Sequence, residues 1–284
     1  MKAIIQSIAS QLQTVYPAEE AEALAWWVAE EVTGLSRTQL LCGCKGTKNI
    51  PNTQDIIERL LHFEPIQYIF GHTFWCGLDL KVTPATLIPR PETGELVEKL
   101  SVVSRQPSVP SLRVLDIGTG SGCIAIALKK RHPEWQVTGI DISAEAIEVA
   151  RENARRNDAE VDFQVADIFS VAKGKDCSDE TGGNRLFDLV VSNPPYICEK
   201  EKKDMRRNVL DYEPASALFV PDEDPLRFYR RIAELRWGKQ LFFEINEAYA
   251  DEMQALLAAQ GYAEIQVMED SYGKPRIISC RMAE

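Results

Sequence analysis

The chain has 284 residues, 45% of them hydrophobic and 26% charged, a composition typical of a globular protein and unlike that of a disordered or fibrous chain. This length is enough for roughly two domains, at about 150 residues per domain. The formal net charge of −11 argues against DNA or RNA as the main substrate, because proteins that bind phosphates carry an excess of Lys and Arg.

The sequence carries no obvious targeting or metal-binding pattern. Its first residues turn polar too early for a signal peptide, and no apolar run is long enough to span a bilayer. None of the seven cysteines belongs to a Cys-x-x-Cys pair, and the three histidines lack a metal-ligand spacing. We therefore expect a cytoplasmic protein with reduced thiols, no catalytic metal and no membrane partner.

Residues 1–73 are expected to form a small helical domain. The apolar residues at helical spacing are Leu24, Ala25, Val28, Val32 and Leu35 in one helix, and Ile56, Ile57, Leu60 and Leu61 in a second helix that begins near Asn52. Trp26 and Trp27 are interpreted as core residues of this bundle, and a partner-binding face is the alternative.

Residues 74–93 are expected to form a β-hairpin linker. Apolar and polar residues alternate over 78–82, and the sequence then becomes rich in proline in LIPRPET, residues 87–93. A helix is expected to follow near 95–103.

From residue 94 to residue 284, strand-like and helix-like runs alternate as they do in a doubly wound α/β sheet. The expected strands are 112–117, 136–141, 162–167, 187–192, 241–245, 262–268 and 276–281, and the expected helices are 122–131, 143–156, 225–235 and 247–259. The polar run 171–186 is interpreted as a surface loop. The charged run 199–208 is interpreted as a solvated segment, with a substrate clamp as the alternative.

A glycine turn follows the first of these strands. The turn consists of Gly118, Thr119, Gly120, Ser121 and Gly122, and an apolar helix comes directly after it. Glycines let the backbone approach a ligand closely, and the free amides at a helix start can bind its polar end. Cys123 stands where the dinucleotide fingerprint requires its third glycine. The turn therefore favours S-adenosylmethionine over NAD.

Two acids end the next two strands, on the same edge of the sheet as the glycine turn. Asp141 is expected to accept hydrogen bonds from the ribose hydroxyls of the cofactor, and Asp167 to meet the adenine amino group. Either acid by itself could instead be a helix cap. Their position beside the glycine turn favours cofactor binding.

The fourth strand leads into Asn193, Pro194, Pro195 and Tyr196 at the same edge of the sheet. An amide nitrogen is a poor nucleophile because its lone pair is delocalised, so an enzyme that methylates one must hold it precisely. The Asn193 side-chain oxygen and the Pro194 carbonyl can accept both protons of an NH₂ group, the prolines stiffen the backbone, and Tyr196 can cover the planar group. A simple turn is the alternative interpretation.

Five sequence blocks, spread over nearly the whole chain, carry a family resemblance. They are EPIQYIFG at 64–71, LIPRPET at 87–93, the turn at 116–122, NPPYI at 193–197, and YEP at 212–214 with Ala217 and Leu218. In these blocks the chain resembles the HemK/PrmC family, the release factor glutamine N5-methyltransferases.

This resemblance implies a class I methyltransferase domain with a Rossmann-like seven-stranded sheet whose last strand is antiparallel, preceded by a helical domain that docks the substrate. It implies methyl transfer from S-adenosylmethionine to the glutamine of the Gly-Gly-Gln motif in class 1 peptide chain release factors, by an enzyme expected to be a monomer. The cofactor residues would be Gly118 to Gly122, Asp141, Asp167, Ile168, Phe169 and Asn193, and the substrate residues would be Arg90 and Asn193 to Tyr196.

The chain departs from the family pattern at two of these places. Gly94 follows LIPRPET where the family usually carries an acid, so any contact of that acid is in question. Ile168 stands where some members place an aromatic residue near adenine, so stacking would depend on Phe169 or be aliphatic.

Three other functions compete with this interpretation. An N6-adenine or N2-guanine methyltransferase could use the same Asn-Pro-Pro-Tyr platform on a flipped base, but the acidic net charge argues against a nucleic-acid substrate. A noncatalytic module that binds the cofactor only for stability would not need Asn193 and Tyr196. An NAD oxidoreductase is disfavoured by Cys123.

Overall fold

The computed structural model describes residues 2–44, 53–103, 111–171 and 187–283. Its contacts divide the chain into two compact units, residues 1–71 together with 206–212, and residues 72–205 together with 213–284. We call the first the helical unit and the second the sheet unit. All but the first residue of the run 171–186, expected to be a surface loop, lies outside the described residues.

The helical unit is built from short amphipathic helices. They are α1 (Lys2–Leu12), α2 (Ala18–Thr33), α3 (Arg37–Leu41), α4 (Thr53–Leu61), α5 (Ile66–Phe70) and α9 (Arg207–Leu210). Helix α2 begins after Pro17 and ends at Gly34, whose φ of 68° is the left-handed conformation that closes many helices. Within the described residues of the whole chain, no helix has the length and apolarity needed to cross a membrane.

The core of the helical unit confirms most of the predicted apolar faces. Its buried members are Ile5, Ile8, Ala9, Leu12, Ala21, Ala25, Val28, Ala29, Val32, Leu40, Ile56, Ile57, Leu60 and Ile66. Trp26 and Trp27 are half-buried and pack against this core, as expected. The guanidinium of Arg37 lies 4.5 Å from the centre of the Trp26 ring, which covers part of that ring's exposed side.

The segment 206–212 joins the helical unit although its sequence neighbours belong to the sheet unit. The Tyr212 hydroxyl donates to the His62 carbonyl at 2.9 Å, and the Arg207 guanidinium lies 4.7 Å from the centre of the Phe63 ring. Arg206 pairs with Glu20 at 3.1 Å. The end of the charged run 199–208 is thus held by contacts, although its arginine side chains remain largely exposed.

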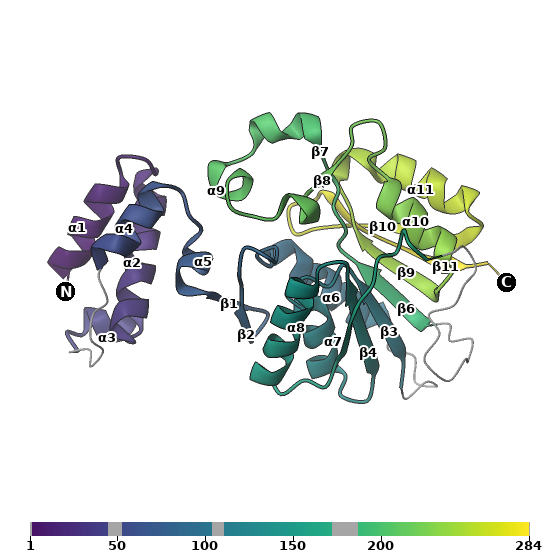
Figure 1. The fold of residues 1–284 in the computed structure, drawn as a ribbon, viewed down its shortest axis with the longest axis horizontal. Coiled ribbons are helices and arrows are strands. Elements are labelled where there is room, and N and C mark those ends of the chain that lie inside the picture. The colour runs from purple at the N-terminus through teal and green to yellow at the C-terminus, as the bar shows by residue number, and fades with distance from the viewer. Residues whose placement is uncertain (1, 45–52, 104–110, 172–186, 284) are drawn as a thin grey trace. The chain divides into compact units, whose positions relative to one another are not determined.

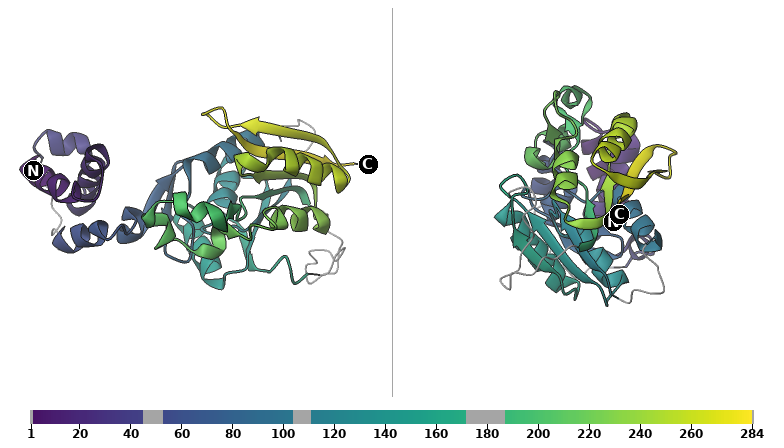
Figure 2. Two further views of the ribbon diagram at one scale, coloured as in Figure 1. Left: turned by 90° about the horizontal axis from the view of Figure 1, so that it is seen from above. Right: turned by 90° about the vertical axis from the view of Figure 1, so that its right-hand side faces the viewer.

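The sheet unit contains a seven-stranded sheet of order β10-β11-β9-β6-β3-β4-β5. The strands are β3 (Arg113–Ile117), β4 (Gln136–Asp141), β5 (Asp162–Val165), β6 (Phe187–Ser192), β9 (Gly238–Glu244), β10 (Tyr262–Glu269) and β11 (Pro275–Met282). All seven were predicted. The last strand, β11, runs antiparallel to both of its neighbours, and β10 and β11 pair at one edge of the sheet (Figures 1 and 2). Rossmann-like topology and the antiparallel last strand are therefore confirmed.

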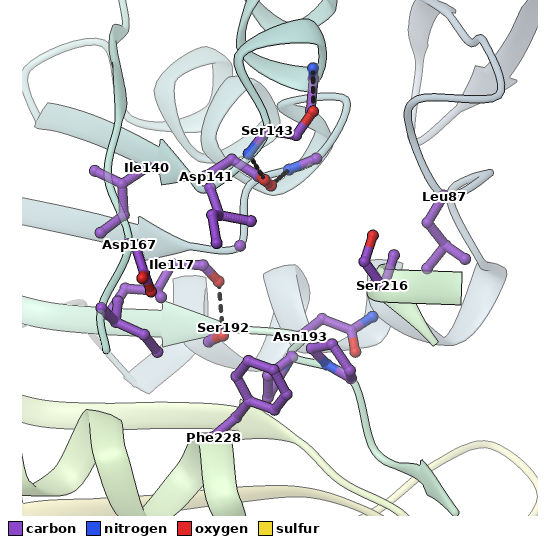
Figure 3. Close-up of a pocket in the computed structure, with 18 of the residues that line it drawn as sticks. Leu87, Ile117, Ile140, Asp141, Ser143, Asp167, Ser192, Asn193, Ser216 and Phe228 are labelled. Carbon is purple, nitrogen blue, oxygen red and sulfur yellow. Dashed lines mark hydrogen bonds between the residues drawn. The ribbon is translucent and has the colours of Figure 1, made fainter. Parts of the chain in front are cut away.

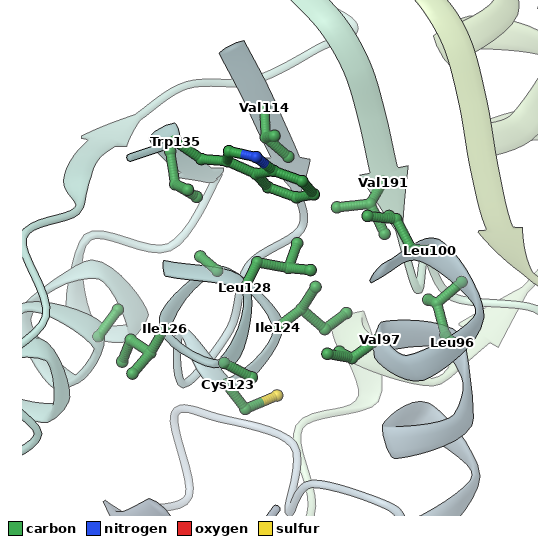
Figure 4. Close-up of a cluster of buried hydrophobic side chains, with 14 of the residues drawn as sticks. Leu96, Val97, Leu100, Val114, Cys123, Ile124, Ile126, Leu128, Trp135 and Val191 are labelled. Carbon is green, nitrogen blue, oxygen red and sulfur yellow. The ribbon is translucent and has the colours of Figure 1, made fainter. Parts of the chain in front are cut away.

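Helices cover both faces of the sheet. Helices α6 (Pro91–Val103), α7 (Cys123–Arg131) and α8 (Ala144–Arg156) pack on one face, and α10 (Arg227–Leu235) and α11 (Ala250–Ala259) on the other (Figure 1). The central strands β3, β6 and β9 are largely apolar and buried on both sides, as central strands of a sheet covered on both faces must be. In β6, for example, Leu189 and Val191 face the first layer, shown in Figure 4, and Val190 faces the second.

Helix α6 begins at Pro91, four residues earlier than expected. Residues 91–93 were expected to belong to the linker because the run LIPRPET is rich in proline. A proline is, however, favourable at the first position of a helix, where its missing N–H costs no hydrogen bond. This start places Thr93 in the first turn of α6, where it is buried.

The linker hairpin pairs β1 (His72–Trp75) with β2 (Leu78–Lys81), so pairing begins two residues before the expected start at 74. Its turn, Cys76-Gly77, has positive φ at both residues, which two-residue hairpin turns favour. A Cβ added to Gly94 of α6 would lie 2.8 Å from the Cys76 sulfur, so the departure from the family pattern at Gly94 fits the crowding under this turn.

Two asparagines, Asn153 in α8 and Asn157 at its C-cap, hold strand β2 of the hairpin. Asn157 accepts from the Asp79 amide at 3.2 Å and donates to the Asp79 carbonyl at 2.9 Å. Asn153, one turn earlier, bonds in the same way to the amide and carbonyl of Lys81, at 2.6 and 2.9 Å. The two side chains thus satisfy backbone groups of β2 as a neighbouring strand would.

Candidate active site

A cavity of about 520 Å³ opens at the carboxyl ends of β3, β4 and β6, within the range of small-molecule sites. The residues that line it are Ala85 to Leu87, Ile117, Gly118, Gly120, Ile140 to Ser143, Ala146, Ala166 to Phe169, Ser192 to Pro195, Pro214, Ser216, Ala217, Phe219, Arg227, Phe228 and Ile232. Figure 3 shows Asp141 and Ser143 on one side, Leu87 and Ser216 on the opposite side, and Asn193 and Phe228 below.

Two glycines of the predicted turn expose their backbone to this cavity. Gly118 and Gly120 have φ values of 71° and 55°, and a Cβ added to either would meet no atom within 4 Å. The space in front of them is therefore open to a ligand. Gly122 has a different role, because its added Cβ would lie 3.0 Å from both Ala150 and Phe163. It lets α8 and β5 pack closely against the start of α7.

Side chains from neighbouring elements fix the glycine turn. The Asp141 carboxylate accepts from the amides of Gly120 and Ser143, each at 2.9 Å. Its oxygens keep lone pairs for ligand hydroxyls, and Ser143, rather than Asp141, caps α8. The Ser121 carbonyl accepts from fully buried Asn153 at 2.9 Å, the same asparagine that holds the hairpin.

Thr119 and Ser121 are buried and do not line the cavity. The Thr119 hydroxyl donates to the Asp116 carboxylate of β3 at 2.6 Å. Complete burial raises the pKa of Asp116 to about 7, although the Thr119 hydroxyl and the Ala125 amide favour the charged form. The turn is therefore anchored from below by an acid that is close to its point of titration at neutral pH.

The far end of the cavity is an apolar slot. Ile168 is buried, and the ring of Phe169 meets Phe228 edge to face at 5.3 Å. Arg227 lies 4.9 Å from the centre of the Phe169 ring. Such walls suit a flat, weakly polar group such as adenine.

Asp167 lines this slot and also caps its own turn. Its carboxylate accepts from the Phe169 amide at 2.8 Å and from the Ser170 hydroxyl at 2.6 Å. The Ser170 bond lowers the pKa of Asp167 most, so the group is an anion at neutral pH. The capping interpretation and the ligand-facing interpretation thus apply to the same residue.

Asn193, Pro194 and Pro195 line the cavity where β6 ends. The Asn193 side chain donates through Nδ2 to the Thr93 hydroxyl at 3.1 Å. Tyr196 does not line the cavity, and its hydroxyl donates to buried Glu244 at 3.1 Å. Burial and the nearby Glu244 raise the pKa of Tyr196, so this phenol stays protonated.

Arg90 also lies outside the cavity lining. Its guanidinium donates to Glu213 at 2.7 Å, and the second oxygen of this buried carboxylate accepts from the Ile88 amide at 3.1 Å. The Arg90 carbonyl accepts from the Trp75 indole at 2.7 Å. These contacts fix the segment that carries Leu87 to the cavity. No ligand contact was predicted for Leu87.

Comparison with known proteins decides the family. Residues 108–266 match the model of a methyltransferase domain, and residues 3–71 match the model of the PrmC N-terminal domain. A release factor glutamine methyltransferase of Bacteroides thetaiotaomicron is 44% identical over 98% of this chain and 99% of its own length. The chain belongs to the release factor glutamine methyltransferase family. A second relative, from Flavobacterium psychrophilum, is 39% identical over 94% of both chains.

The fold of this release factor glutamine methyltransferase family member is also similar to that of solved structures. A methyltransferase from Pyrococcus furiosus aligns with a TM-score of 0.51 and 18% identity, over 81% of this chain and all of that one. The hMettl16 catalytic domain, in complex with MAT2A 3'UTR hairpin 1, aligns with a TM-score of 0.55 and 13% identity, over 98% and 92% of the two chains. At these identities the likeness shows the methyltransferase fold alone.

Several residues in or near the site of this family member were not predicted from the sequence. One wall of the cavity is formed by Ala85 to Leu87, Pro214, Ser216, Ala217 and Phe219. Only Leu87, Pro214 and Ala217 of this wall belong to the blocks that carry the family resemblance, and no role was predicted for them. Glu244 was missed, although a lone acid at the end of the apolar run LFFEI is a usable signal, because buried charge needs partners. Thr93 gave no separate signal, since its partners are distant in sequence.

Proposed function

We propose that the protein transfers a methyl group from S-adenosylmethionine to the side-chain amide nitrogen of the glutamine in the Gly-Gly-Gln motif of class 1 peptide chain release factors. One observation carries the proposal: a single cavity joins the open glycine backbone at Gly118 and Gly120 to the Asn193-Pro194-Pro195 platform. The name of the relatives, release factor glutamine methyltransferase, supports the choice of substrate.

The residues of the cavity fit S-adenosylmethionine, which would supply an electrophilic methyl group on a sulfonium. The open backbone at Gly118 and Gly120 suits its methionine part, and the Asp141 carboxylate can accept from its ribose. The slot between Ile168, Phe169 and Phe228 suits its adenine. No metal is required for this chemistry.

The platform would hold the glutamine amide in one plane. Because Nδ2 of Asn193 is bonded to Thr93, its carbonyl oxygen is left to accept one proton of the substrate NH₂. The Pro194 carbonyl would accept the other, and the two prolines limit backbone motion. The ionisable residues among the described cavity lining, Asp141, Asp167 and Arg227, lie at the cofactor end. The platform thus acts by orientation, and the proton of the product leaves to water.

The helical unit is proposed to dock the release factor. It matches the N-terminal domain model of the family, and Trp26 and Trp27 remain half-buried on its surface. A monomeric state and a cytoplasmic location stay predictions.

The test is methyl transfer from labelled S-adenosylmethionine to a purified release factor. Label is expected on the Gly-Gly-Gln glutamine, and it should be lost when that glutamine is replaced or when the enzyme carries Asn193→Ala. The Asn157→Ala variant is the matched control, because this asparagine holds the hairpin and does not line the cavity. Label on DNA or RNA but not on the factor would overturn the proposal in favour of a base methyltransferase.

A further inference from the structure

Two buried side chains lie behind the platform without lining the cavity. Thr93 of α6 is 3% exposed and Glu244 at the end of β9 is 1% exposed. The Thr93 hydroxyl donates to Glu244 Oε2 at 2.7 Å, and the Tyr196 hydroxyl donates to Glu244 Oε1 at 3.1 Å. One carboxylate therefore holds both ends of the Asn193 to Tyr196 segment, at one end through Thr93.

The direction of these hydrogen bonds follows from the chemistry of the groups. An ionised carboxylate only accepts, so Thr93 must donate its single hydroxyl proton to Glu244. The Thr93 oxygen can then only accept from Asn193, which must turn its NH₂ group toward Thr93. The amide oxygen of Asn193 has no partner in the described part of the chain, and it is the atom left for a substrate.

We propose that Thr93 and Glu244 are positioning residues that set the orientation of the Asn193 amide and so present its oxygen, rather than its NH₂ group, to the substrate nitrogen. We call the two hydrogen bonds from Asn193 to Thr93 and from Thr93 to Glu244 the relay. The inference rests on the proposed function for its substrate, while the relay is present in the protein without substrate. A reversed Asn193 would offer hydrogen-bond donors to a substrate NH₂ group, which needs acceptors.

The surroundings of Glu244 make this orientation dependent on pH. Burial raises the pKa of Glu244, and the Thr93 and Tyr196 hydroxyls and the Arg276 guanidinium oppose that rise. The Glu92 carboxylate raises the pKa further, and the Tyr229 hydroxyl donates to the backbone carbonyl of Glu244. A protonated Glu244 can donate to Thr93, which would reverse the relay. Activity should therefore be lost as the pH falls through the raised pKa.

The first test compares Thr93→Val, which keeps the shape without the hydroxyl, with Thr93→Ser, which keeps the hydroxyl. Thr93→Val should lower kcat by about 10- to 100-fold, the usual effect of a misplaced group, with little change in cofactor affinity. Thr93→Ser should restore most of kcat. Ser101→Ala is the matched control, because it removes a buried hydroxyl eight positions further along α6 that bonds only within the helix, to Val97. A Thr93→Val enzyme with unchanged kcat would overturn the proposal.

A second measurement does not depend on activity. In protein labelled with ¹⁵N-asparagine, the Asn193 side-chain NH₂ signal, assigned by its loss in Asn193→Asp, should be protected from exchange in the wild type and in Thr93→Ser. That protection should disappear in Thr93→Val. If the wild type keeps the protected signal but methylates no release factor, the proposed function fails and the relay stands. An unprotected signal in the wild type removes the relay.

A third measurement tests Glu244 through the pH profile. The wild-type kcat should fall toward acid, and Glu244→Gln, which cannot titrate, should have a lower kcat that lacks this acid limb. The same acid limb in both enzymes would assign the titration to another group and exclude Glu244 as the controlling residue.

Discussion

Two walls of the cavity, the cofactor wall and the platform, are built in opposite ways. The cofactor wall is local: its turn, its acids and its apolar slot come largely from residues 117–169 and are fixed by bonds to backbone amides, as at Gly120 and Ser143. The platform is fixed by side chains from far apart in the chain, since Asn193 bonds to Thr93, 100 residues earlier, and Thr93 bonds to Glu244, 151 residues later. A cofactor site can therefore be carried by one continuous motif, whereas the platform depends on the completed fold.

Each wall also has a buried carboxylate behind it. Asp116 lies under the glycine turn with the Thr119 hydroxyl as its side-chain donor, and Glu244 lies under the platform with two hydroxyl donors and nearby Arg276. Burial raises the pKa of both groups. The two acids differ in what depends on them, because we expect Asp116 to affect stability and Glu244 to affect turnover.

Replacing Asp116 gives the largest expected effect. Its pKa is raised from 3.8 to about 7, so between these values the folded chain keeps a proton that the unfolded chain has lost. Stability must then fall as pH rises through this window. From pH 4 to pH 8, Asp116→Asn should gain about 4 kcal/mol relative to the wild type in urea unfolding, at about 1.4 kcal/mol per pKa unit.

Asp188 is the control for that measurement, because its carboxylate bonds to Lys239 at 2.7 Å and to the Arg113 amide at 2.9 Å. These partners outweigh burial and lower the pKa of Asp188. The wild type therefore gains stability from Asp188 as pH rises, and Asp188→Asn should become less stable relative to the wild type over the same pH range. Parallel stability curves for Asp116→Asn and the wild type would contradict the assignment and remove the contrast between the two acids.

Gly122→Ala tests how tightly the cofactor wall is packed. The substitution adds a Cβ at a φ of 79° and places it 3.0 Å from Ala150 and Phe163. Strain and overpacking together should cost about 3 kcal/mol in unfolding experiments and weaken cofactor binding. Gly273→Ala, with a φ of 77° and no atom within 4 Å, isolates the backbone strain and should cost about 1 kcal/mol. Equal losses would show that crowding at the turn is unimportant.

Asp141→Ala and Glu244→Gln should separate the two walls in kinetics. The first removes the acceptor for two backbone amides and the ribose, and should weaken cofactor binding about 10- to 100-fold while kcat at saturation changes less. The second should lower kcat without weakening the cofactor. Calorimetric titration with S-adenosylhomocysteine and steady-state kinetics measure the two effects. If both variants changed the same parameter, the division into two walls would be wrong.

The smallest expected effect is that of Asn157→Ala, at the C-cap of α8. It removes two bonds to Asp79 and leaves two backbone groups of β2 to water, at a cost of about 1 kcal/mol. Methyl transfer should be unchanged. Thermal unfolding measures the loss of stability. A large fall in cofactor affinity would contradict the prediction, because it would mean that the contact of Asn157 with the hairpin also affects the glycine turn.

The elements of the sheet were predictable because their signals are local. Largely apolar runs, such as Val114 to Ile117, interrupted only by Asp116, and Leu189 to Val191, mark strands buried on both faces. The glycine turn and NPPY follow these two strands. Gly118, Gly120, Asp141 and Asn193 could therefore be placed at one edge of the sheet, and the structure brings them to one cavity.

The remaining features depend on contacts between distant residues. Nothing local in the sequence indicates that 206–212 leaves the sheet unit, or that Tyr196 turns away from the cavity toward buried Glu244. The pairing of Thr93 with Glu244 needs α6 and β9 to be packed already. The positions of the ligand-facing residues could thus be predicted from the sequence, whereas the side chains that orient them could not.

The hydrogen bonds of Asn153 and Asn157 to β2 can form only after both asparagines have been synthesised. The asparagines that satisfy β2 lie 72 and 78 residues further along the chain, so at about 5 to 20 residues per second they emerge from the ribosome about 4 to 16 s after it. For that interval the outer edge of β2 is open to any other nascent strand. Because the strand has only four residues, its edge is too short to pair strongly with another chain before the asparagines have been synthesised.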